Sequence, residues 1–101
     1  MLYYTQILFV KPGQETVFHA FEEHVLPLLQ HYRGELLYRV RPPQSAVIAT
    51  TLGYPYELHL VTFPTKADFE AYRDDPQRQQ YLALKDQSIE RVLLIEGATL
   101  S

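Results

Sequence analysis

The chain has 101 residues, of which 47% are hydrophobic and 21% are charged. This length and balance predict one domain spanning residues 1–101, with a single modest core. The nine lysines and arginines against twelve aspartates and glutamates give a net charge of −3, so we expect no nucleic-acid partner. The chain has no cysteine, which excludes disulfides and thiolate sites and favours a cytoplasmic location. Its hydrophobic stretches are too short to cross a membrane.

The first part of the chain shows strand, helix and strand signals in turn. Residues 2–10 are almost all β-branched, aromatic or apolar, which predicts a strand. Apolar residues then recur every three or four positions, which predicts a helix over about 14–33. Pro27 predicts a kink or a frayed turn in this helix, and Gly34 is expected to form its left-handed C-terminal cap. A second strand is predicted over 35–41, where a pair of prolines ends it.

The second part begins with an ambiguous segment. Residues 44–53 are expected either to extend the second strand past a bulge or to form a small flap. A third strand is predicted over 56–63. Thr65 is predicted to cap the next helix, and the pair Asp75-Pro76 indicates a further helical start. A fourth strand covers 91–97.

The order of elements is β-α-β-β-α-β, which predicts an α+β, ferredoxin-like fold with an antiparallel sheet and both helices on one face. Alternation along each strand divides the side chains into two sets. The first set is almost entirely apolar and is expected to lie under the helices: Ile7, Phe9, Leu36, Tyr38, Val40, Leu58, Leu60, Val92 and Leu94. The second set mixes apolar with polar side chains: Leu8, Val10, Leu37, Val61, Phe63, Leu93 and Ile95, with Tyr4, Gln6, Arg39, Arg41, Glu57, His59 and Arg91.

The second set predicts a partner for the sheet. A soluble monomer rarely exposes so many large apolar side chains on one face. Since both helices lie on the opposite face, the simplest cover is a second copy of the same sheet related by a two-fold axis. We therefore expect a homodimer that pairs sheet to sheet, with the polar residues of the second set lining a lumen between the two sheets.

Short motifs along the chain resemble a known superfamily. They are Leu28-Leu29-Gln30-His31-Tyr32-Arg33-Gly34, Phe63-Pro64-Thr65, Asp75-Pro76 with Tyr81, and Ile95-Glu96-Gly97. This pattern resembles the dimeric α/β-barrel superfamily, which includes the antibiotic-biosynthesis monooxygenase-like domains, and within it the uncharacterised branch called domain of unknown function 1330. The resemblance implies a two-fold dimer and a small pocket between sheet and helices. It carries over no catalytic residue.

The chain departs from that pattern at two positions that matter below. Many relatives carry a second glycine before Gly34, where this chain has Arg33, and an arginine in the last helix, where this chain has Lys85. Because a lysine does not reproduce a bidentate guanidinium contact, the substitution weakens the expectation of anion binding there.

The candidate chemistry lies on the second and third strands. If these strands pair across the connection 42–54, His59 faces Arg39 and Glu57 faces Arg41. His59 is then a candidate proton donor or acceptor, with Arg39 holding the negative charge of a small organic acid. Further ligand-binding candidates are Tyr4, Gln6, Glu57 and Arg41. Alternatively, these groups are interface salt bridges of a non-catalytic dimerisation or interaction module, so whether the protein is an enzyme stays open.

We expect no cofactor and no metal. His24 and His31 lie seven residues apart on the predicted helix, whereas helical metal pairs use a spacing of four. No acidic residue is placed to complete a site with them, and nothing in the sequence identifies a haem ligand. A Gly-rich phosphate loop and a nucleophile elbow are also absent from the sequence.

Overall fold

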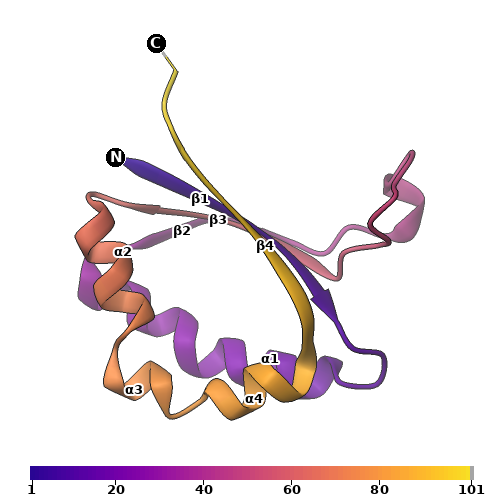
Figure 1. Cartoon of the computed structure of the whole chain (residues 1–101), viewed down its shortest axis with the longest axis horizontal. Helices are drawn as coiled ribbons and strands as arrows, with labels where there is room; N and C mark the ends of the chain where they lie inside the picture. The colour runs from indigo at the N-terminus through magenta and orange to yellow at the C-terminus, as the bar shows by residue number, and fades with distance from the viewer. Residues whose placement is uncertain (101) are drawn as a thin grey trace.

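A computed structural model describes residues 1–100 and shows two layers, an antiparallel sheet and a set of helices that covers one of its faces (Figure 1). The strands are β1 (Leu2–Val10), β2 (Glu35–Val40), β3 (Glu57–Phe63) and β4 (Ile89–Ala98), in the spatial order β2-β3-β1-β4. The helical segments are α1 (Glu15–Val25), η1 (Leu26–Tyr32), η2 (Gln44–Ala46), α2 (Lys66–Arg73), α3 (Pro76–Gln79) and α4 (Leu82–Ser88). This confirms the predicted α+β, ferredoxin-like arrangement.

The first helix changes geometry where its proline predicts a disturbance. The α-helix α1 ends at Val25, and the tighter 3-10 segment η1 continues to Tyr32 with Pro27 in its first turn, where a missing N–H costs little. The predicted cap at Gly34 is wrong, because Arg33 takes the left-handed conformation, with φ of 60°. Gly34 serves another purpose. A Cβ at this position would lie 2.6 Å from Cε1 of Phe63, so glycine lets the aromatic ring pack against the backbone.

The other predicted helix starts are confirmed. The Thr65 side chain accepts a hydrogen bond from the Asp68 N–H at the start of α2, and the Asp75 side chain accepts one from the Arg78 N–H at the start of α3. Of the two alternatives for 44–53, the flap is the one observed: η2 and a turn around Thr50 project beyond the end of the sheet (Figure 1).

The core fills the space between the two layers. Its largest buried cluster joins β1, β3, η1 and α2 and consists of Tyr4, Leu28, Leu29, Val61, Phe63 and Tyr72. Phe69 stacks on Tyr4, with ring centroids 4.1 Å apart. These contacts place the side chains of β1 and β3 that carry the candidate chemistry against the helices.

The face prediction is therefore wrong for β1 and β3 and for most of β2. Tyr4, Gln6, Glu57 and His59 lie on the helix-covered face together with Arg39 and Arg41, not in a lumen between two sheets. The prediction assumed that the more apolar face must meet the helices. Helix α1, however, contributes the buried carboxylate of Glu22, which supplies partners for polar groups of the sheet. The prediction was correct for β4, where Val92 and Leu94 lie on the helix side.

The opposite face of the sheet is mostly apolar, with Thr5, Thr62 and Arg91 among its polar members, and no layer of residues among 1–100 covers it. By the strand registers it carries Ile7, Tyr38, Val40, Leu58, Leu60, Leu93 and Ile95. Tyr38, Val40 and Ile95 are 67%, 49% and 55% exposed. The argument that one sheet face needs a cover thus holds, although it applies to the other face.

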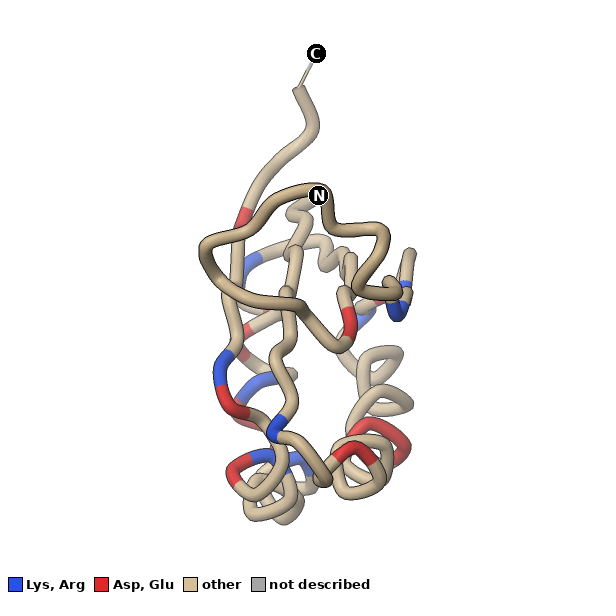
Figure 2. The backbone as a smooth tube through the Cα atoms, turned by 90° about the vertical axis from the view of Figure 1, so that its right-hand side faces the viewer, with Lys and Arg blue, Asp and Glu red and all other residues tan. Residues whose placement is uncertain are grey.

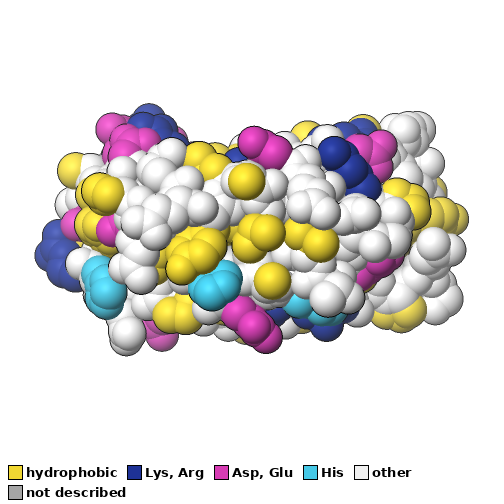
Figure 3. Space-filling model, turned by 90° about the horizontal axis from the view of Figure 1, so that it is seen from below, with side chains coloured by type: hydrophobic (Ala, Val, Ile, Leu, Met, Phe, Trp, Pro, Cys, Tyr) yellow, Lys and Arg dark blue, Asp and Glu magenta, His cyan; other side chains and the backbone are white. Residues whose placement is uncertain are grey.

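Charged groups are distributed over both layers. Acidic and basic residues are interspersed along the sheet and the helices when the molecule is viewed edge-on (Figure 2). The outer side of the helix layer shows hydrophobic side chains, histidines and charged groups together (Figure 3). Among the described residues, no helix is both long enough and apolar enough to pass through a membrane.

The packing role of Gly34 gives a first prediction. We expect Gly34→Ala to lower the free energy of unfolding by roughly 1 to 3 kcal/mol, because the added Cβ overlaps the Phe63 ring. Gly97→Ala is the matched control, since nothing lies within 4 Å of its added Cβ. Urea denaturation measures both values. Equal stability of the two variants would contradict the proposed contact.

Candidate functional site

Five charged or titratable side chains form one cluster at the helix-covered face of the sheet. His59 and Glu57 lie on β3, Arg39 lies beside His59 on β2, Arg41 follows β2, and Glu22 reaches the cluster from α1. Arg39 donates to Glu22 Oε1 at 2.7 Å and lies 3.2 Å from Glu57 Oε2. Arg41 donates to Glu57 Oε1 at 2.7 Å. The cluster therefore ties the sheet to the helix layer through buried carboxylates.

His59 lies between the two carboxylates. Its Nε2 is 2.5 Å from Glu57 Oε2 and 2.7 Å from Glu22 Oε2. An imidazole nitrogen carries one hydrogen at most, and the geometry directs it to Glu57. Glu22 Oε2 is consequently buried without a hydrogen-bond partner among residues 1–100. Glu22, Glu57 and His59 are 2%, 0% and 4% exposed, so all three groups are shielded from bulk solvent.

Burial and the neighbouring groups shift the pKa values of Glu22 and Glu57 in opposite directions. Burial raises the pKa of Glu22, and the nearby Glu57 raises it further against the opposing influence of His59. Burial also acts to raise the pKa of Glu57, but the hydrogen bonds from His59, Arg41 and Arg39, together with the neighbouring Glu22, outweigh burial and hold that pKa well below its usual range. Burial lowers the pKa of His59, but its two carboxylate neighbours reverse this and raise it. The favoured state is thus a charged His59 against an ionised Glu57.

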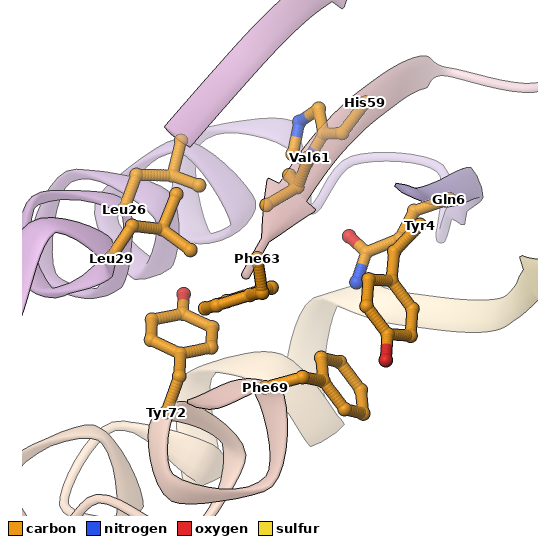
Figure 4. A pocket seen from close by; sticks show the side chains of 9 residues that line it. All are labelled: Tyr4, Gln6, Leu26, Leu29, His59, Val61, Phe63, Phe69 and Tyr72. Carbon is orange, nitrogen blue, oxygen red and sulfur yellow. The ribbon is translucent and has the colours of Figure 1, made fainter. Parts of the chain in front are cut away.

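Hollows between the layers border this cluster. One is lined by side chains that converge from β1, β3, η1 and α2 (Figure 4): Tyr4, Gln6, Leu26, Leu29, His59, Val61, Phe63, Phe69 and Tyr72. It encloses about 30 Å³, and an adjoining one of about 40 Å³ also includes Glu22 and Arg78 in its wall. A third hollow of about 230 Å³ continues outward between β4 and the helices α2 to α4. We call these three hollows together the cleft. His59 lies at its inner end.

The residues predicted for the site lie close together in the structure, but Arg39 has a different role from the predicted one. The predicted pairs are confirmed: Arg39 lies opposite His59 in the strand register, and Arg41 forms an ion pair with Glu57. Arg39 lines none of the three hollows, and its nitrogens are bonded to Glu22 and Glu57. In the structure, Arg39 therefore binds the carboxylates of Glu22 and Glu57 and not a ligand.

Tyr4 and Gln6 line the cleft as neighbours on β1. The Tyr4 hydroxyl donates to Glu96 at 2.7 Å, and burial together with Glu96 raises the pKa of Tyr4 to about 12. Tyr4 therefore stays protonated, and its ring forms a fixed part of the cleft wall. Gln6 borders all three hollows and is the polar side chain best placed to contact a ligand along the length of the cleft.

Two residues of the site were not identified from the sequence. Glu22 lies within the apolar stripe of the first helix, next to Phe21 and four residues after Phe18, and a charged residue in such a stripe signals a buried partner. Arg78 follows the cap at Asp75 by three residues and carries no comparable signal. Its position depends on how α3 lies against α1 and α2, where Arg78 contacts the Phe21 and Tyr72 rings.

The cluster also meets the spatial criterion for a metal site. Glu22, Glu57 and His59 offer ligand atoms within 4.8 Å of one another. Two guanidinium groups already occupy these carboxylates and oppose a cation by charge repulsion, so the residues present do not fit a metal ion. The histidines of the first helix have aromatic partners instead: His24 stacks on Tyr81, and His19 contacts the Tyr56 hydroxyl.

Comparisons with known proteins identify the fold. No family model and no curated protein matches the sequence. A protein of unknown function from Rhodopseudomonas palustris superimposes with a TM-score of 0.82 at 13% identity, over 99% of this chain and 82% of that one. A dimeric ferredoxin-like protein of unknown function from Jannaschia sp. CCS1 gives 0.71 at 19%, over 97% and 98%. A dabb family protein with a ferredoxin-like fold from Mesorhizobium loti gives 0.67 at 17%, over 99% and 97%. At these identities the comparisons establish the ferredoxin-like fold.

The unequal carboxyl groups give a second prediction. Glu22→Gln imitates a protonated carboxyl group, so the free energy of unfolding should change by less than about 1 kcal/mol. Glu57→Gln removes the charge that balances two arginines and His59, and should cost roughly 2 to 4 kcal/mol, since both arginines remain partly exposed. Urea denaturation at neutral pH measures both values. A larger loss for Glu22→Gln would show that the ionised group is Glu22 instead.

The raised pKa of His59 gives a third prediction, on pH. A histidine whose pKa is higher in the folded state contributes its full stability below its ordinary value of 6.5 and loses that contribution as the pH rises through the folded pKa. Glu22, also raised, acts in the same direction. The urea midpoint should therefore decrease from near-neutral to alkaline pH, and less steeply in His59→Asn. A midpoint that rises with pH over this range would contradict the assignment.

Proposed function

We propose that the protein is a homodimeric small-molecule-binding domain that holds a small organic acid in the cleft, with His59 as a proton donor to that ligand. The observation that supports this most directly is the position of His59. A buried imidazole, charged and braced by Glu57 beside the unpartnered Glu22 Oε2, lies at the inner end of a cleft with a largely apolar wall. Buried titratable groups with shifted pKa values at a hollow are typical of proton-transfer sites.

The division of roles follows from the contacts. Since the Nε2 hydrogen of His59 is directed to Glu57, the charged imidazole would give the ligand the proton on its other ring nitrogen and become neutral. Glu57 stabilises the charged form before the transfer. Arg39 and Arg41 hold the carboxylates, and Gln6 orients the ligand along the cleft. Acid–base chemistry of this kind requires only side chains, so we propose a cofactor-independent reaction.

The homodimer is proposed to form through the open face of the sheet. That face carries large apolar side chains across the strands, more than a soluble monomer normally exposes. The Jannaschia protein with the same fold is described as dimeric. We further propose membership of the dimeric α/β-barrel superfamily and its domain of unknown function 1330 branch, on the motifs quoted above. The cytoplasmic location and the lack of a nucleic-acid partner stay predictions.

A non-catalytic dimerisation module is the alternative, and one observation favours it. The hollows next to His59 are small, and the carboxylates there are already paired with arginines, as in a purely structural cluster. Native mass spectrometry of the gently purified protein separates the two functions. A mass of twice 11.8 kDa with a reproducible organic adduct supports the proposed binding function, whereas an adduct-free dimer supports the module.

Two variants of adjacent residues on β4 give a fourth prediction. Ile95 lies on the open face and Leu94 on the cleft side, and their exposed fractions of 55% and 48% are similar. Ile95→Asp should place a charge in the sheet-to-sheet interface and give a monomer, whereas Leu94→Asp should remain dimeric. Sedimentation measures the difference. A wild-type monomer, or two variants that both stay dimeric, would overturn the proposed interface.

The proton-transfer step is tested once the adduct is identified. With the wild-type protein in D₂O, the bound compound should take up deuterium at the protonated position, and His59→Asn should abolish that uptake. Leu94→Trp, which fills the cleft from β4, should lose the adduct while keeping the dimer. Deuterium uptake that persists in His59→Asn would remove His59 from the reaction.

A further inference from the structure

Two cations that line the outer hollow of the cleft form no ion pair in the described part of the chain, and Asp74 and Asp86 act on them only from beyond ion-pair distance. Arg78 on α3 and Lys85 on α4 both line the hollow of about 230 Å³. Neither forms an ion pair with any carboxylate of residues 1–100, whereas their neighbour Arg73 is paired with Asp74. In a chain with a net charge of −3, acidic partners are plentiful, so a pair of unmatched cations in a concave position needs an explanation.

Arg78 is held in place without being neutralised. Its guanidinium lies over the Tyr72 ring, 5.1 Å from the centroid, and at 6.0 Å from the Phe21 centroid. Its Nη1 donates to the Arg73 carbonyl oxygen at 3.1 Å. Its Nε is buried with no hydrogen-bond partner among the described residues. Because this Nε is shielded from the hollow as well, an anion would meet the guanidinium through its Nη atoms, whose orientation is fixed.

Lys85 supplies the second charge from the neighbouring helix. It is half-buried, and its pKa is lowered by burial and by the positive charge of Arg78. The two cations thus repel each other in the ligand-free protein. An anion between them would remove this repulsion, which is a source of binding free energy specific to charged ligands.

The opposite wall defines the rest of the ligand. Val92 and Leu94 of β4 and the Phe69 ring form an apolar surface across from the cations, and the Gln6 amide lies where this hollow adjoins the inner ones. About 230 Å³ is below the 300 to 1,000 Å³ typical of drug-sized ligands, so the space suits a small molecule with a short apolar body.

We propose that Arg78 and Lys85 form the carboxylate-binding subsite of the cleft and that the ligand is a small acid with one carboxylate and a short apolar body. This inference rests on the proposed binding function and gives the ligand's charge, which the sequence had assigned to Arg39, to Arg78 and Lys85 instead. Lys85 lines only the outer hollow, whereas Arg78 also borders the hollow of about 40 Å³ that His59 lines. The carboxylate binds at the mouth, and the apolar body extends toward Gln6 and the inner hollows.

The test compares benzoate with benzamide, its neutral analogue of nearly the same shape. In calorimetric titrations of the wild-type protein, benzoate should bind at least about tenfold more tightly, as expected for a charge-assisted hydrogen bond. Lys85→Met should remove this preference. Lys66→Met is the matched control, since Lys66 is exposed on α2 and only distantly paired, at 3.9 Å from Glu96.

The melting temperature of the ligand-free protein provides a second test that does not depend on benzoate. Because Lys85→Met relieves the repulsion by Arg78, it should raise the melting temperature, and Lys66→Met should not. Arg78→Met also removes packing on Tyr72, so Lys85→Met is the decisive variant.

Four results would overturn the subsite: equal affinity for benzoate and benzamide, a preference that survives Lys85→Met, no benzoate binding at millimolar concentration, or inorganic phosphate binding as tightly as benzoate. None of these decides the proposed function, which depends on the adduct of the native dimer. An adduct-free dimer that nevertheless prefers benzoate would reject a retained ligand while supporting the subsite.

Discussion

The contact between Glu22 of α1 and the polar groups of β2 and β3 determines how the two layers meet. A carboxyl group that is 2% exposed is tolerated only where polar partners compensate for its burial. Arg39 donates to one oxygen of Glu22, and His59 lies 2.7 Å from the other. Once these groups pair, the helices must cover the face of the sheet that carries them. The more apolar face is then left open, and His59 is enclosed at the inner end of the cleft. Fold, interface and site thus depend on the same buried ion cluster.

Local signals account for what the sequence predicted correctly in the fold. Thr65 and Asp75 cap helices through side-chain hydrogen bonds that involve only the next three residues, and Pro27 acts on its own helix. The choice of sheet face is not local. It depends on whether a polar side chain finds a partner on another element, and alternation along a strand does not contain that information. The cap at Gly34 failed for the same reason, because the requirement for glycine comes from the Phe63 ring of a distant strand.

The same distinction between local signals and contacts across the fold applies to the candidate site. The pairing of Arg39 with His59 and of Arg41 with Glu57 followed from the hairpin relation of two strands, so it was predictable. Glu22 was recognisable in principle as a charge within an apolar stripe. Arg78 was not recognisable from the sequence. It matters because it forms no ion pair in the hollow that it lines, and that is known only once the helices are placed beside β4.

The two ends of the cleft use positive charge in opposite ways. At the inner end, the nitrogens of Arg39 and Arg41 are occupied by Glu22 and Glu57, so these two arginines fix the cluster around His59 and have few donors left for a ligand. At the outer end, Arg78 and Lys85 are unmatched, so the electrostatic attraction for an anion is concentrated there. A carboxylate placed between the inner arginines would have to displace Glu57, which His59, Arg39 and Arg41 already hold. The organic acid that we propose would therefore bind with its carboxylate at Arg78 and Lys85 and its uncharged end toward His59.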